Sequence, residues 1–182
     1  VARHKIKARE AITSISGHSV IIKKITLPAM SDEELAESIQ WEAEQYIPFD
    51  INEISLAHHI INPNGHSETM DILLIAAQNE LVNQYLNVMT SAGLSGSIID
   101  VSGFALANIF EVNYGKIPNQ AVALLNIGSS VTNFVVVIDG EVIFTRDIPV
   151  GGFNYTNEIS KEMGISFAEA ESLKLGACAG HE

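Results

Sequence analysis

Cysteine and long hydrophobic runs are both scarce in this sequence. Its single cysteine, Cys178, cannot form a disulfide within the chain, which fits a reducing compartment. No apolar run reaches the roughly 18 residues that a membrane-spanning helix needs, and the pattern leads us to expect no signal peptide. The 182 residues are nevertheless 47% hydrophobic, which predicts a folded globular protein. Because Val1 rather than methionine begins the chain, we expect a piece of a longer protein.

Positive charge is missing from the middle of the chain. Residues 25–115 contain no Lys or Arg and 13 Asp or Glu, whereas six of the ten basic residues lie in the first 24 positions. A region whose charged side chains are all acidic repels phosphates, so we expect no nucleic-acid partner. The acidic region suits a basic peptide, such as the Lys/Arg-rich cytoplasmic tail of an inner-membrane protein, or it serves solubility alone.

Most motifs that would indicate an enzyme are absent. The sequence has no P-loop, no Rossmann glycine pattern and no nucleophile elbow. His58 and His59 point to opposite faces of a predicted strand, and no His/Cys/acid cluster has zinc spacing. We therefore predict no catalytic residue and no metal ligand.

Hydrophobic patterning divides the chain into three parts. Residues 1–9 are polar and basic and resemble a linker or the remnant of a preceding segment. Residues 10–100 predict a compact α+β unit, with two helices on a sheet of about five strands. The predicted strands are 11–16, 19–27, 54–61, 70–77 and 95–101, with a turn at Asn62-Pro63-Asn64-Gly65.

The clearest helix in the sequence spans residues 31–49. Ser31 and Glu34 form a capping box, and Pro48 ends the helix. One stripe of the helix is apolar: Leu35, Ile39, Ala43, Tyr46 and Ile47. Trp41 lies off this stripe, among Glu37 and Glu44. An aromatic side chain on an acidic face is either covered by a neighbouring domain or offered to a partner.

A second helix is predicted over residues 79–93, and its C-terminal glycine is Gly93. Its predicted inward residues are Leu81, Tyr85, Val88, Met89 and Ala92. An apolar helix capped by Ser102 follows at 102–115. Strands are then predicted at 121–128, 131–139 and 141–150, the last two joined by Asp139-Gly140 as in a type I′ hairpin.

The β-branched composition of these three strands predicts a sheet that is covered on both faces. Two helices are expected at 153–164 and 166–176, and Ser166 with Glu169 forms a second capping box.

The turn between the first two of these strands has the composition of a phosphate cradle. Gly128 lets the backbone approach a phosphate closely, and Ser129, Ser130 and Thr132 supply hydroxyl donors. Asn126 stands where a metal-organising acid would be expected. A Gly-Ser-Ser turn in a hairpin is also an ordinary turn, so the turn alone does not decide between these alternatives.

Three later segments, "FTRDIPVGG", "NYTNEI" and "AEAESLKLG", follow this turn in an order that resembles the nucleotide-binding lobe of bacterial actin relatives. In such lobes a D-x-G turn organises metal and phosphates, a Gly-Gly pair opens a helix, and an A-E-x-x-K helix reaches the ribose and base. The resemblance implies these nucleotide-binding residues: Asn126, Gly128, Ser129, Ser130, Thr132, Gly151, Gly152, Glu171 and Lys174.

The segments "SISGHSVIIKKI", "ESIQWEAEQYIPFDI" and "DVSGFALANIFE" resemble the PilM family of type IV pilus assembly proteins over nearly the whole chain. The resemblance implies an actin-like, ribonuclease H-like lobe fragment at 101–182. It also implies that residues 10–100 form a small α+β subdomain of the SHS2 type, similar to that of the division protein FtsA.

The implied function is that of a cytoplasmic adaptor, peripheral at the inner membrane. It would bind the N-terminal tail of the membrane protein PilN and meet other motor or platform proteins of the pilus. We expect Trp41, Glu37 and Glu44 to be the partner-binding residues. An actin-like ATPase of the FtsA type is the alternative, and a cytoplasmic platform of a secretion system is a third.

Two departures from the actin pattern limit the expected chemistry. The first phosphate loop and the glycine-rich adenosine motif of actin-like folds do not occur in these residues. Asn126 is also neutral, which makes it a poorer partner for hydrated Mg²⁺. ATP with Mg²⁺ is implied for a full-length protein, but we expect neither to bind well to this chain and hydrolysis to be weak or absent.

Overall fold

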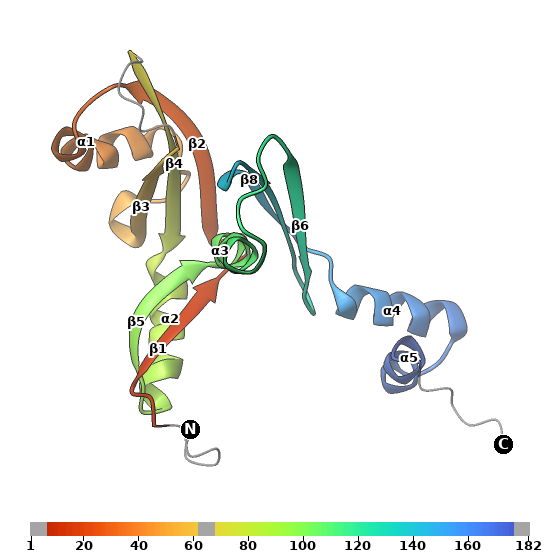
Figure 1. Cartoon of the computed structure of the whole chain (residues 1–182). Coiled ribbons are helices and arrows are strands. Elements are labelled where there is room, and N and C mark those ends of the chain that lie inside the picture. The colour runs from red at the N-terminus through yellow and green to blue at the C-terminus, as the bar shows by residue number, and fades with distance from the viewer. Residues whose placement is uncertain (1–6, 62–67, 177–182) are drawn as a thin grey trace. The chain divides into compact units, whose positions relative to one another are not determined.

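A computed structural model describes residues 7–61 and 68–176. The chain divides into two compact units, Val1–Ala105 and Leu106–Glu182. Figure 1 shows the elements of each unit. Cys178, the first six residues of the predicted linker, and the turn predicted at 62–65 lie outside the described residues.

The strands of the first unit form two sheets, not the single five-stranded sheet expected. β1 (Glu10–Ile15) pairs in parallel with β5 (Ser95–Val101). β4 (Thr69–Gln78) lies between β2 (Val20–Pro28) and β3 (Ile54–Ile60) and is antiparallel to both. The sequence could not show this because β1 finds its partner far along the chain rather than in β2, and a parallel pair needs a long connection.

The helix α1 (Asp32–Glu44) covers one face of the three-stranded sheet. Ser31 accepts from the Glu34 N–H at 3.2 Å and donates its own N–H to the Glu34 carboxylate at 2.8 Å, which confirms the capping box. The predicted stripe is confirmed at its buried positions Leu35, Ile39 and Ala43. They pack against alternate residues of β4: Met70, Ile72, Leu74 and Ala76. A short 3-10 turn (Ile51–Glu53) leads from α1 into β3.

The second helix, α2 (Asn79–Ser91), buries a different stripe from the one predicted. Met89 is buried as expected, whereas Tyr85, Val88 and Ala92 are exposed. Leu86 and Met89 point at Gly96 of β5, where a side chain would come within 2.7 Å of Met89. The stripe is narrow because α2 rests mainly on the two-stranded β1–β5 sheet. Gly93 ends α2 with a positive φ, as predicted.

Ser102 is the first residue of α3 (Ser102–Tyr114) rather than the residue that precedes and caps it. Its hydroxyl donates to the Ile15 carbonyl oxygen at 3.2 Å and lies 3.1 Å from the Ser14 hydroxyl. This residue therefore ties the end of β1 to the start of the helix, a contact between distant parts of the chain that local sequence does not reveal.

The second unit contains the antiparallel sheet β6–β7–β8, formed by Ala121–Ile127, Thr132–Ile138 and Glu141–Ile148. Asp139 and Gly140 both have positive φ, as a type I′ turn requires. Val135 and Val137 pack against Ala107 of α3. The prediction that both faces are covered is wrong for the described residues, since Leu125 and Ile127 are 60% and 63% exposed. The reason is that α3 covers the face of Val135 and Val137, and β6 is an edge strand.

Two helices follow the sheet, α4 (Gly152–Met163) and α5 (Phe167–Lys174). The second capping box is confirmed, because Ser166 and Glu169 exchange hydrogen bonds of 2.8 and 3.3 Å. Gly164 ends α4 in the left-handed conformation. Within the described residues, no helix has both the length and the apolar character needed to cross a membrane.

Candidate functional site

The turn between β6 and β7 is closed by its own backbone. The Gly128 N–H donates to the Val131 carbonyl oxygen at 3.0 Å, and a Cβ at Gly128 would lie 2.8 Å from that oxygen. Ser129 and Ser130 are exposed at the tip. The N–H groups of these two serines donate to no other residue in the part of the chain that the structure describes. They are therefore open to an anion.

The start of α4 packs directly on this turn. The N–H groups of Gly152 and Phe153 donate to the carbonyl oxygens of Gly128 and Ser129, at 2.9 and 2.8 Å. A Cβ at Gly151 would lie 2.5 Å from the Ser129 oxygen and 2.6 Å from the Gly128 oxygen. Because these two backbone oxygens lie so close to Gly151, only glycine fits at this position. These two N–H groups of α4 are thus engaged by the turn, which leaves the serine amides as the open donors.

Thr132 ties the turn to the segment before α4. Its hydroxyl donates to the Val150 carbonyl oxygen at 2.7 Å, and the residue is buried. Asn154 completes the junction, because its side-chain oxygen accepts from the Gly151 N–H at 2.9 Å. Of the three predicted hydroxyl donors, Ser129 and Ser130 therefore lie at the exposed tip of the turn, whereas Thr132 is buried and bonded to Val150.

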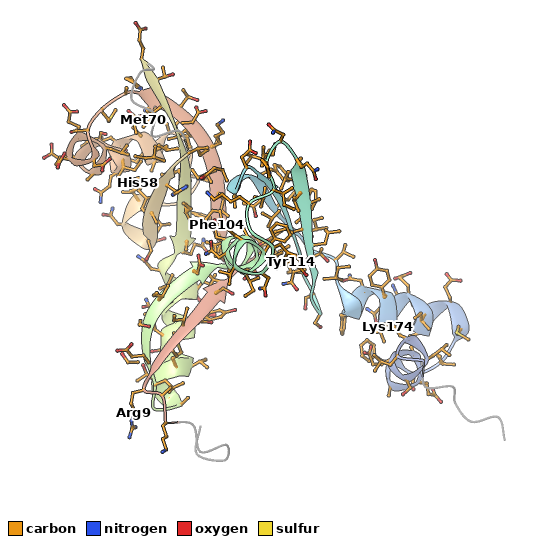
Figure 2. The ribbon with its side chains drawn as sticks, viewed as in Figure 1. Arg9, His58, Met70, Phe104, Tyr114 and Lys174 are labelled. Atoms are coloured by element: carbon orange, nitrogen blue, oxygen red, sulfur yellow. The ribbon has the colours of Figure 1, made fainter. Side chains whose placement is uncertain are left out.

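Glu171 and Lys174 of α5 contact the N-terminal half of α4 through the buried hydroxyl of Thr156. The Lys174 ammonium donates to Glu171 Oε2 at 2.7 Å, to Thr156 Oγ1 at 2.8 Å and to the Gly152 carbonyl oxygen at 3.2 Å. The hydroxyl of the fully buried Thr156 bonds to the Glu171 carboxylate and lies 3.0 Å from the Gly152 oxygen. These three bonds account for the three donors of a lysine ammonium. Figure 2 labels Lys174 on α5 beside α4.

A shallow hollow opens where the turn, α4 and α5 meet. Its lining consists of Ser129, Gly152, Phe153, Phe167, Glu171 and Lys174. The rings of Phe153 and Phe167 lie 5.0 Å apart at 37° and both are partly exposed. The structure thus brings together the predicted turn, the Gly-Gly pair and the Glu171–Lys174 pair around one hollow.

Asn126 begins a row of polar side chains that crosses the sheet. Its Nδ2 donates to Asn133 Oδ1 at 3.0 Å, and Asn133 Nδ2 donates to Asp147 Oδ1 at 2.7 Å. The three residues are register partners in β6, β7 and β8. In the described residues no three His, Cys, Asp or Glu side chains are grouped so that they could hold a metal ion.

Sequence reasoning missed three residues of this site: Thr156, Asn133 and Asp147. Polar residues inside the apolar runs "VTNFVVV" and "VIFTRDI" were a usable signal for Asn133 and Asp147. Thr156 carried no such signal, because its role depends on where α5 folds back onto α4.

Hydrogen bonds hold the pKa of several carboxyl groups below the ordinary range. The Lys174 ammonium, followed by the Thr156 hydroxyl, lowers the pKa of Glu171. Ser166 lowers the pKa of Glu169, and Lys24 with Thr26 lowers that of Asp71. A lowered pKa means that the stabilisation is complete above the unfolded-state value, about 4, and is lost as pH falls through the folded value.

We therefore expect the midpoint temperature of thermal unfolding to decrease as the pH is lowered from about 5 to about 3. Glu171→Gln should make this fall shallower, because the variant cannot gain the proton that breaks the contact with Lys174. Glu158→Gln is the matched control, since the Glu158–Lys161 pair on α4 is exposed on both sides. Thermal unfolding followed by circular dichroism at a series of pH values shows how steeply the midpoint of each variant depends on pH. An equal dependence for the two variants would contradict the role given to Glu171.

The predicted partner residues lie together on α1, in the first unit. Trp41 is 73% exposed, and Glu37 and Glu44 on either side of it along the helix are exposed as well. These residues are one turn from Trp41 in each direction, so the three form one surface, which we call the Trp41 patch. Its placement outside the buried stripe of α1 agrees with the sequence pattern.

Comparison with known proteins identifies the family. The family described as "Type IV pilus assembly protein PilM" matches residues 1–180. The chain belongs to the PilM family. A chain of the solved "PilM-PilN type IV pilus biogenesis complex" is 28% identical, with a TM-score of 0.85 over 94% of this chain and 52% of that chain. These matches confirm the expected α+β, actin-like fold class.

Two further proteins are similar to smaller extents, FtsA in sequence and EpsL in fold alone. FtsA of Bacillus subtilis, a cell division protein, is 33% identical over 101 residues, which are 56% of this chain and 22% of FtsA. The cytoplasmic domain of EpsL from the type II secretion system of Vibrio cholerae is 9% identical with a TM-score of 0.53, over 89% of this chain and 57% of that one. The chain thus spans about half the length of the solved relatives and less of FtsA.

Proposed function

We propose that the chain is part of a cytoplasmic adaptor of type IV pilus assembly, peripheral at the inner membrane. It binds the N-terminal tail of a PilN-like membrane protein and links motor or platform proteins of the pilus to the membrane complex. Membership of the PilM family and the likeness to a chain of a PilM–PilN complex support the choice of partner.

The observation that carries this proposal is the Trp41 patch. A tryptophan that is 73% exposed offers a large apolar surface, and such residues are enriched among the strongest contacts of protein interfaces. The carboxylates of Glu37 and Glu44 flank it, in a region that lacks Lys and Arg from residue 25 to 115. A tail rich in Lys or Arg would pair with the carboxylates and place a cation over the indole ring.

A second proposal concerns the hollow in the other unit. We propose that it is part of a nucleotide site for ATP with Mg²⁺ in the full-length protein. Supporting observations are the open amides of Ser129 and Ser130 and the Phe153–Phe167 pair, which lie at the hollow beside the Glu171–Lys174 ion pair. The phosphates would lie against the serine amides. Because Asn126 is neutral where an acid would partner hydrated Mg²⁺, we expect hydrolysis by this chain to be weak or absent.

Two titrations separate the adaptor from an actin-like ATPase. The chain and its full-length parent are each titrated with ATP·Mg²⁺, and separately with a synthetic PilN-like tail, by calorimetry. We expect the tail to bind both proteins without nucleotide, and we expect no turnover by the 182-residue chain. Micromolar ATP binding with turnover by this chain, and no tail binding, would overturn the adaptor proposal.

A further inference from the structure

The three-stranded sheet of the first unit has two edge strands that differ in charge. β4 lies between β2 and β3, so each outer strand has one side without a partner strand among residues 7–61 and 68–176 (Figure 1). β2 carries the exposed Lys23 and Lys24 and ends at Pro28. Lysine and proline on an edge strand discourage pairing with another chain. β3 has no charged residue, no proline and no bulge against β4, so it lacks all of these protections.

The backbone of β3 alternates between β4 and the free edge. The Ile61 N–H donates to the Asp71 carbonyl oxygen at 2.9 Å, and these two residues continue the register of β3 with β4. In an antiparallel pair only every second residue bonds to the same neighbour. The residues that direct N–H and C=O away from β4 are therefore Leu56, His58 and Ile60. These groups have no hydrogen-bond partner in the part of the chain that the structure describes.

We propose that β3 is the edge at which two copies of this chain pair, antiparallel and about a two-fold axis at Ala57. In this register the whole of β3 overlaps β3 of the second copy. The open backbone groups of Leu56 meet those of His58 in the second copy, and Ile54 lies opposite Ile60. Ala57 faces its own counterpart in a non-hydrogen-bonded pair, where the two Cα atoms are about 4.5 Å apart. A small, exposed side chain suits this close approach.

The charge of β3 favours a second copy as the occupant. Copies of a chain with a net charge of −12 repel one another, so they meet with least repulsion where the surface carries no charge. The acid nearest to the strand, Glu53, would lie opposite Ile61 of the second copy rather than opposite another acid. A basic tail gains no ion pair from a strand without carboxylates. Because the contact is small, we expect a weak dimer that forms at high protein concentration.

Pairing at β3 has a consequence for the Trp41 patch. Side chains that lie opposite each other in a strand pair point to the same face of the sheet. The α1 helices of both copies therefore cover the same face of the joined sheet. A dimer would carry two Trp41 patches on that face and could hold two tails at once, which raises the avidity for a membrane protein that is itself clustered. This consequence rests on the tail binding proposed above, whereas the pairing does not.

Single cysteines test the position of the axis. In a Cys178→Ser background, Ala57→Cys brings two sulfhydryl groups together with Cα atoms in the range that a disulfide needs, so we expect a disulfide-linked dimer on mild oxidation. Ser55→Cys is the matched control, because Ser55 is exposed on the same face of β3. Its two copies would lie four residues apart along the strands, about 13 Å, which is too far for a disulfide. Equal yields of dimer from both cysteines, or none from either, would overturn the proposal.

Sedimentation equilibrium measures the same pairing without a cross-link. Ala57→Lys places two ammonium groups at the axis, and we expect the dissociation constant of the dimer to rise at least tenfold. Ser55→Lys adds the same charge away from the axis and should change the constant less than threefold. His58→Pro removes an N–H that points to the free edge and leaves the bonds to β4 in place. It should also weaken the dimer, with little change in the midpoint of thermal unfolding.

Three results would contradict the pairing. The wild-type chain stays monomeric up to its solubility limit, or Ala57→Lys and His58→Pro dimerise as tightly as the wild type. In the third, the wild-type chain is monomeric and Ala57→Lys loses binding of a PilN-like tail, which would assign the β3 edge to the tail instead of a second copy. Failure of the tail to bind the Trp41 patch would leave the expected dimer and its cross-link unchanged.

Discussion

Gly151→Ala is expected to lower the free energy of unfolding of the second unit by about 3 kcal/mol. The added methyl group would lie 2.5 and 2.6 Å from the backbone oxygens of Ser129 and Gly128 in the turn between β6 and β7. Backbone atoms cannot rotate away as a side chain can, so α4 must move off the turn. Its hydrogen bonds from Gly152 and Phe153 to Gly128 and Ser129 would then be strained or broken.

The neighbouring glycine supplies a matched control for that substitution. A Cβ at Gly152 would lie 3.3 Å from the Nζ atom of Lys174, the end of a flexible side chain, and Gly152 has no positive φ. Gly152→Ala should therefore cost less than about 1 kcal/mol, because alanine is also the better helix former. Urea unfolding followed by circular dichroism gives both values. Equal losses for the two variants would show that the turn and α4 are not in close contact.

The second large effect is expected at the partner surface. Trp41→Ala should weaken binding of a PilN-like tail by about 10- to 100-fold, because an exposed tryptophan at an interface centre is a common site of concentrated binding energy. The free energy of unfolding should change by no more than about 0.5 kcal/mol, since the indole is 73% exposed. Calorimetric titration and thermal unfolding of the same preparations provide the two measurements.

Val88→Ala is the control for this experiment. Val88 is 71% exposed on α2 of the same unit and lies outside the Trp41 patch, so its loss should affect neither tail binding nor stability strongly. If Trp41→Ala instead destabilises the unit by several kcal/mol, the indole is part of a packed core. If both variants bind the tail as the wild type does, the partner docks elsewhere.

Features set by neighbouring residues could be predicted from the sequence. The capping boxes of Ser31 and Ser166 depend on a partner three residues away, and both formed as expected. The position of Trp41 outside the buried stripe followed from helical periodicity, as did the burial of Leu35 and Ile39. In each case the deciding interaction lies within one or two helical turns.

Features set by distant contacts could not be predicted in the same way. The apolar stripe of α2 was misplaced because Gly96 of β5 decides which residues can point inward. The alternation of β1 and β2 indicated strands but not that they belong to different sheets. Within the site, the turn was singled out by its composition, and the Gly-Gly pair by the resemblance to the nucleotide-binding lobe of bacterial actin relatives. Thr156 was not found, because its partners come from α5.

The central claim is that a PilN-like tail docks on the Trp41 patch. The fluorescence of Trp41 measures this most directly, because Trp41 is the single tryptophan of the chain. A PilN-like tail peptide without aromatic residues is titrated into the chain in the absence of nucleotide, and the emission spectrum of Trp41 is recorded. Docking on the Trp41 patch predicts a saturable change in emission that shifts toward shorter wavelength and weakens as salt is raised. An unchanged spectrum, while calorimetry shows that the same peptide binds, would contradict the account.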